Sequence, residues 1–109
     1  MKPLFWIGTS KRDIRESPPS VRKNIGDKLF MVQDGLKPPG SKPLTGFGSA
    51  NVREIVENDR SGTYRAVYTL EVKDVVYVLH VFKKKATKGK KTAPGDIATI
   101  KARLKEVRP

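Results

Sequence analysis

Apolar positions divide the chain into helical and extended segments. Between residues 17 and 36, apolar side chains recur at steps of three or four, which is the spacing of one face of a helix. These positions are Val21, Ile25, Leu29, Val32 and Leu36. Ser17 followed by two prolines is typical of a helix start, and Gly35 is typical of a helix end. The pattern therefore predicts an amphipathic helix between these two signals.

The segments before this helix predict a strand and a second, shorter helix. Residues 4–7 form an apolar run closed by Gly8, which indicates a short buried strand. Ser10 then supplies an N-cap with an acidic residue three positions later. Because Pro18 and Pro19 interrupt this second helix, we expect it to be short.

The second half of the chain predicts strands and a final helix. Prolines and glycines in residues 37–49 indicate a connecting loop, with Leu44 and Phe47 as its apolar anchors. Extended patterns follow at residues 52–57, 63–72 and 75–83. The short turns between them imply antiparallel neighbours. A last helix, from about Pro94, has an apolar stripe at Ile97, Ile100, Leu104 and Val107.

Together these segments predict an α+β fold. The expected order is an N-terminal strand, a helical pair, an antiparallel three-strand meander and a C-terminal helix, in one domain spanning residues 1–109. The strand at 75–83 is apolar at both parities, which favours a central strand covered on each side. We expect the helices to pack on one face of the sheet and a basic surface to stay open.

Composition adds a strong positive charge to this picture. The 109 residues include 23 Lys and Arg against 11 Asp and Glu, for a net charge of +12 and a pI near 10.2. This balance favours RNA, DNA or another anionic surface as the partner. The absence of cysteine excludes disulfides and thiolate metal sites. Without a signal-peptide pattern or an apolar run of about 20 residues, we expect a cytoplasmic protein and no membrane partner.

Part of the charge is concentrated directly after the last predicted strand. Six lysines lie between residues 83 and 91. They are Lys83, Lys84, Lys85, Lys88, Lys90 and Lys91. A strand end held by a core can direct such charges at a polyanion. The alternative is a solvated lysine loop with no ligand.

The order of several short motifs resembles a known family. The chain contains these motifs in the following order: Trp6 in the first strand, the helical pair, residues 42–47, residues 52–55, the Tyr-Arg-Ala-Val-Tyr run at 64–68, the basic strand end at 80–85 and the basic last helix. This arrangement is similar to the phage-derived HigB-like branch of the RelE/ParE toxin superfamily. The resemblance implies a compact RelE-like domain and a type II toxin. Such toxins are endoribonucleases that cut messenger RNA, typically on the ribosome.

The resemblance also implies a partner. Toxins of this branch are silenced by a cognate antitoxin that usually carries a helix-turn-helix domain. DNA would then be contacted only indirectly, through the antitoxin.

Candidate catalytic residues follow from the same resemblance. Arg65 stands where the superfamily places a catalytic arginine, and Lys84 aligns with its second basic position, with Lys85 beside it. Their implied role is to stabilise negative charge at the scissile phosphate. His80, the only histidine, is a candidate proton donor or base, although a core residue is the alternative. We expect further RNA contacts from Lys42, Arg53, Lys83, Lys88, Lys90 and Lys91.

No metal or other cofactor is expected. Glu54, Glu57 and Asp59 lie on a strand and turn without the spacing of a metal site. A single histidine excludes a two-histidine ribonuclease mechanism. Phe47 and Tyr64 are candidates for base stacking, with a core role as the alternative for both.

Two other functions remain open at this stage. The lysine loop is longer than in many relatives, and the tyrosine that some of them place after the basic strand end is absent. The alternatives are therefore a non-catalytic nucleic-acid-binding module and an inactive toxin-fold scaffold.

Overall fold

A five-stranded sheet forms the centre of the computed structural model, which describes residues 1–48, 50–85 and 91–108. In space the strands follow the order β1-β5-β4-β3-β2. Neighbouring strands are antiparallel, except that β1 runs parallel to β5. The strands are β1 (Leu4–Trp6), β2 (Lys42–Pro43), β3 (Val52–Asp59), β4 (Gly62–Thr69) and β5 (Val76–Lys83).

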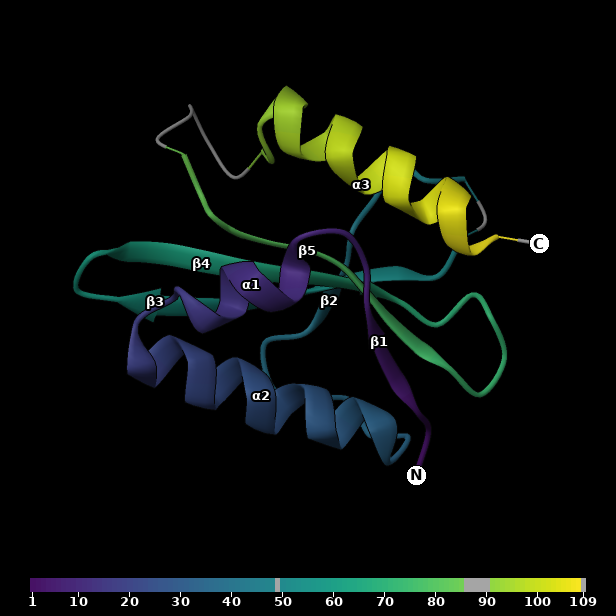
Figure 1. The fold of residues 1–109 in the computed structure, drawn as a ribbon, viewed down its shortest axis with the longest axis horizontal. Coiled ribbons are helices and arrows are strands. Elements are labelled where there is room, and N and C mark those ends of the chain that lie inside the picture. The colour runs from purple at the N-terminus through teal and green to yellow at the C-terminus, as the bar shows by residue number, and fades with distance from the viewer. Residues whose placement is uncertain (49, 86–90, 109) are drawn as a thin grey trace.

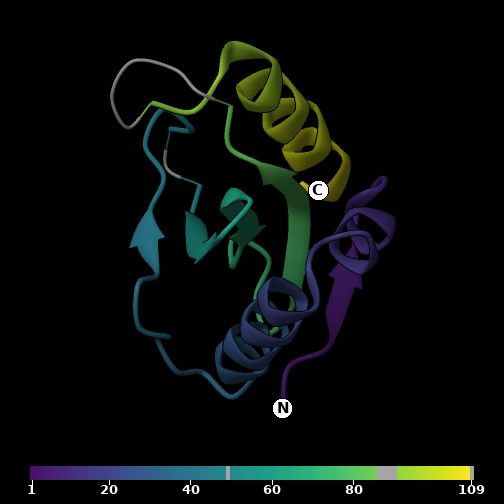
Figure 2. The same ribbon diagram turned by 90° about the vertical axis from the view of Figure 1, so that its left-hand side faces the viewer.

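The helices cover both faces of this sheet. α1 (Ser10–Arg15) and α2 (Pro19–Gln33) lie on one face, and α3 (Pro94–Val107) lies on the other (Figure 1). Figure 2 shows the same arrangement from the side, with β5 running between α2 and α3. The prediction that all helices pack on one face is therefore wrong. The physical reason lies in β5, because a strand that is apolar at both parities must be covered on both sides.

The predicted α+β fold is confirmed, with a larger sheet than the three-strand meander. β3, β4 and β5 form that meander, while β1 and β2 extend it on its two sides. The loop prediction missed β2 because its two residues are too few to show alternation. Pro43 is tolerated there because an edge strand can do without one backbone donor.

The core consists of two apolar clusters, one on each face of the sheet. α2 buries the predicted side chains except the last one, since Leu36 lies beyond the helix end and is 56% exposed. The second cluster packs α3 on the sheet through Ile100 and Leu104, with Phe47 from the loop as predicted. No helix in the described ranges is long and apolar enough to cross a bilayer.

A β-bulge in β5 changes which side chains face α3. Val67 pairs with His80 and Tyr68 pairs with Val78, so Leu79 has no partner in the register. A bulge lets two successive residues point to the same side. As a result, Leu79 packs in the α3 cluster and His80 also reaches α3, whereas Val81 joins the α2 cluster. The simple alternation predicted for this strand holds only on either side of the bulge.

Gly8 is a point where the backbone approaches α3 closely. Its φ is +57°, and a Cβ atom there would lie 2.5 Å from Nε of Arg103. That guanidinium is held in place, because it donates to the Leu79 carbonyl at 2.9 Å and to the Thr9 hydroxyl at 3.1 Å.

We expect Gly8→Ala to lower the free energy of unfolding by about 1–3 kcal/mol, since alanine must accept a left-handed φ and also displace Arg103. Urea denaturation measures the change. Gly35→Ala is the matched control, because Gly35 has a φ of +79° but nothing within 4 Å of an added Cβ. Equal losses in the two variants would show that the contact with Arg103 costs nothing.

Candidate active site on the α3 face of the sheet

A buried ion pair lies on the α3 face of the sheet. Nη1 of Arg65 donates to both carboxylate oxygens of Glu54, at 2.9 Å each. The two side chains are only 5% and 2% exposed. Arg65 is opposite Val56 and Glu54 is opposite Val67, so the two residues are diagonal neighbours on adjacent strands. Nε of Arg65 is buried and has no hydrogen-bond partner among the described residues.

This ion pair lines an open cavity of about 400 Å³. The other residues around the cavity come from the loop before β3, from the segment just before α3 and from the first turn of α3. They are Leu44, Thr45, Lys91, Thr92 and Ile97. Lys42 on β2 is also close, with its Nζ 3.5 Å from Oε1 of Glu54. The cavity therefore brings together three cationic side chains and one carboxylate, a combination that can bind a phosphate and accept a proton.

His80 lies beneath α3 and is not among the described residues that line this cavity. Its Nε2 is 2.8 Å from Oδ1 of Asp96, and its ring stacks on Phe82 with centroids 4.6 Å apart. Nη1 of Arg103 lies 3.4 Å from Nδ1. An arginine can only donate, so this contact assigns Nδ1 as the acceptor and Nε2 as the nitrogen that donates to Asp96. The imidazole thus joins β5 to α3.

The other predicted site residues are divided between the two faces. Lys42 and Lys91 lie at the cavity of Arg65, as just described. Arg53 lies on the α2 face, where it donates to the hydroxyl and the carbonyl of Ser41 at 3.2 Å each. Lys83 lines a smaller cavity with Asp13, Glu16 and Tyr64. The structure therefore does not bring Arg53 and Lys83 together with Arg65.

The remaining lysines follow the end of β5. The backbone N–H of Lys84 donates to the carbonyl of Thr63 at 2.7 Å, which extends the strand pairing by one residue. The Lys84 side chain is half-buried and that of Lys85 is exposed. Lys88 and Lys90, which were predicted to contact RNA, lie outside the described residues.

Neither candidate for base stacking is among the described residues that line the Arg65 cavity. Phe47 is 7% exposed within the α3 cluster. Tyr64 packs against the α2 cluster, on the face opposite Arg65, and its hydroxyl is 2.8 Å from that of Ser61. Phe47 is therefore a core residue, whereas Tyr64 is partly buried at the edge of the core.

The sequence analysis did not identify the acidic partners of Arg65 and His80, which are Glu54 and Asp96. The pairing of Glu54 with Arg65 could have been predicted from the hairpin. Its turn pairs Asp59 with Gly62, and this register puts Glu54 and Arg65 on the same face of the sheet. Hydrogen bonds from Ser61, first of all from its backbone N–H, lower the pKa of the Asp59 carboxyl and support this turn. For Asp96 no signal existed, since nothing in the sequence tells which turn of α3 packs on His80.

Comparison with solved structures identifies the class of fold. The isolated RelE toxin of E. coli matches with a TM-score of 0.59 at 22% identity, over 81% of this chain and 89% of that chain. The intact E. coli RelBE toxin–antitoxin complex matches with a TM-score of 0.58 at 24% identity, over 78% and 99%. The RelBE2 toxin–antitoxin complex of Mycobacterium tuberculosis gives 0.51 at 23% identity, over 76% and 98%. The fold is that of the RelE-like toxins, as the sequence predicted.

The sequence itself places the protein in a family. A family model described as phage derived protein Gp49-like matches residues 12–105. The chain therefore belongs to the Gp49-like family of phage-derived proteins. No curated protein matches its sequence significantly. The RelE-like fold is thus confirmed, while the HigB-like branch stays a prediction.

Proposed function

We propose that this protein is the toxin of a type II toxin–antitoxin pair and that it cleaves messenger RNA, on the ribosome, without a metal ion. The observation that carries the proposal is the cavity holding Arg65 and Glu54, edged by Lys42 and Lys91, on the sheet of a RelE-like fold. Phosphate groups suit such a cationic cavity, and the net charge of +12 favours the approach of RNA.

We assign a candidate group to each step of the cleavage. Glu54 is the only carboxylate among the described lining residues, and we assign it the removal of the proton from the 2′-hydroxyl. The 2′-oxygen then bonds to phosphorus, and the bond from phosphorus to the 5′-oxygen breaks. Arg65 stabilises the charge that develops on the phosphoryl oxygens. The products are a 2′,3′-cyclic phosphate and a 5′-hydroxyl.

The lysines supply charge and the last proton. We assign Lys84 and Lys85 to transition-state stabilisation, and either can protonate the leaving 5′-oxygen. We assign to Lys42 and Lys91 contacts with the RNA backbone beside the reacting phosphate. The bond from His80 to Asp96 favours a role in holding α3 over that of a proton donor.

The proposal includes a partner and a location. Two of the structurally similar proteins are toxin–antitoxin complexes, which supports a cognate antitoxin for this chain as well. We propose that this antitoxin carries a helix-turn-helix domain and that the complex contacts DNA through it. The toxin would act in the cytoplasm, where its messenger RNA substrate is translated.

One observation favours a second candidate function, a non-catalytic binding module or inactive scaffold. Nη1 of Arg65 is engaged by Glu54 at both oxygens, and the side chain is 5% exposed. If this pair is purely structural, single lysine substitutions should each weaken RNA binding slightly and equally, and no RNA should be cut.

Purified protein added to messenger RNA on translating ribosomes tests the proposal. We expect fragments with 5′-hydroxyl and 2′,3′-cyclic phosphate ends. Arg60→Ala should cleave as the wild type does, because Arg60 is an exposed arginine in the β3–β4 turn. This variant is the control for the loss of one positive charge. Bound but intact RNA would contradict the proposal.

A further inference from the structure

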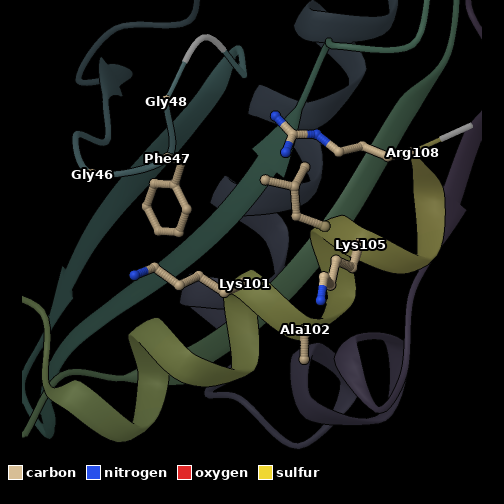
Figure 3. A pocket seen from close by; sticks show the side chains of 8 residues that line it. Gly46, Phe47, Gly48, Lys101, Ala102, Lys105 and Arg108 are labelled. Atoms are coloured by element: carbon tan, nitrogen blue, oxygen red, sulfur yellow. The ribbon is translucent and has the colours of Figure 1, made fainter.

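A second hollow lies between the C-terminal half of α3 and the loop of residues 46–48 (Figure 3). Its volume is about 710 Å³. The bottom is apolar, with Phe47 from the loop and Leu104 from α3, and the exposed Ala102 on α3 also lines the hollow. Gly46 and Gly48 leave the loop side open, because nothing lies within 4 Å of a Cβ atom added at either position.

The rim of this hollow is positively charged. Lys101 and Lys105 are exposed one helical turn apart, and neither has an ion-pair partner among the described residues. Arg108 follows at the end of α3 and donates from Nε and Nη2 to the carboxylate of Glu71, at 2.7 and 2.9 Å. These hydrogen bonds lower the pKa of the Glu71 carboxyl and fix one end of the rim. No acidic side chain is among the described residues that line the hollow.

We propose that this hollow docks an acidic protein segment that places one large apolar side chain over Phe47 and Leu104. An apolar bottom favours burial of an aliphatic anchor, and a cationic rim favours carboxylates on either side of it. RNA fits less well. Bases stack on open aromatic faces, whereas the one ring among the described lining residues, Phe47, is 7% exposed.

The position of the hollow connects it to the candidate active site. Leu44 and Thr45 line the cavity of Arg65, and the next three residues of the same loop line the hollow. A segment anchored here would therefore lie beside the Arg65 cavity, separated from it only by this loop. The step from an acidic segment to the antitoxin as its source rests on the proposed function, whereas the docking itself does not.

Binding of a designed peptide to the full-length protein tests the proposal. The probe is a fluorescent helical peptide of about 15 residues with a central leucine and glutamates one turn to either side. We expect Lys101→Glu/Lys105→Glu to weaken its binding by roughly tenfold or more. The control Lys11→Glu/Lys37→Glu has the same net charge, carries its changes on α1 and after α2, and should bind nearly as the wild type does.

Two further arms identify the occupant. Replacing the central leucine of the peptide by serine should weaken binding, and a uridine decamer should not displace the peptide. The proposal would be overturned if the two charge-reversal variants lost equal amounts of peptide affinity, or if the leucine-to-serine change in the peptide had no effect. Either result would show that the peptide binds through net charge alone. Displacement by the decamer would assign the hollow to RNA instead. Glu54→Gln should leave peptide binding unchanged, so failure of the docking proposal and failure of the proposed nuclease remain distinguishable.

Discussion

Replacing Arg65 by alanine is expected to lower the free energy of unfolding by about 3–5 kcal/mol, because the variant leaves the Glu54 carboxylate buried without its main partner. Glu54 is 2% exposed, and Nζ of Lys42 lies 3.5 Å from its Oε1 on a side chain that is 48% exposed. Lys42 can therefore compensate only a small part of the lost interaction. Urea denaturation at neutral pH measures the change, with exposed Arg60→Ala expected to stay within about 0.5 kcal/mol of the wild type.

A double variant separates the stability of the pair from its chemistry. Glu54→Leu/Arg65→Met removes both charges and fills their space with apolar side chains. Because a buried ion pair can often be exchanged for packed apolar residues without loss, we expect a free energy of unfolding within about 1.5 kcal/mol of the wild type. A double variant as unstable as Arg65→Ala would contradict this explanation of the single-variant loss.

Glu54→Gln is expected to slow RNA cleavage by about 10²–10⁴-fold, because the amide cannot take the proton of the 2′-hydroxyl. The change keeps the shape of the side chain and leaves an oxygen that can accept from Arg65, so the loss of stability should be smaller, about 1–2 kcal/mol. RNA affinity should hold or rise, since a negative charge leaves the cavity. Single-turnover cleavage, together with binding of an RNA carrying a 2′-deoxy group at the scissile position, measures both effects.

Glu57→Gln is the matched control for this prediction. Glu57 lies on the same strand but contacts Lys28 and Asn24 of α2, on the opposite face of the sheet. Its replacement should leave the cleavage rate unchanged. A Glu54→Gln variant that cuts at the wild-type rate would show that Glu54 only holds Arg65 in place.

The sequence predicted those features of the fold that come from a repeating pattern of apolar residues along a helix or strand. The burial of Val21, Ile25, Leu29 and Val32 followed from their spacing, because an amphipathic helix must bury its apolar face. The bulge at Leu79 could not be predicted in this way, since one unpaired residue leaves the apolar pattern of β5 unchanged. The short edge strand β2 was equally hidden, because its pairing depends on where the loop passes β3.

The candidate site was predictable in part, and mainly through the resemblance to a family. Arg65 was singled out by its motif, but its burial and its pairing depend on Glu54, which alternation along the hairpin places on the same face. Arg53 and Lys83 were assigned to the same surface from charge alone, and charge carries no information about the face of a strand. The contact of His80 with Asp96 depends on how α3 packs, which no local pattern encodes.

Mapping of RNA 5′ ends in bacteria, combined with growth curves after induced expression, tests the proposed activity most directly. The comparison is between the wild type and the Glu54→Leu/Arg65→Met variant, after purified samples of both have been shown to be folded. We predict growth arrest and new 5′ ends inside translated messages with the wild type, and neither effect with the variant. Identical growth and identical 5′ ends for the two proteins would contradict the account and leave the basic surface as a binding site without catalysis.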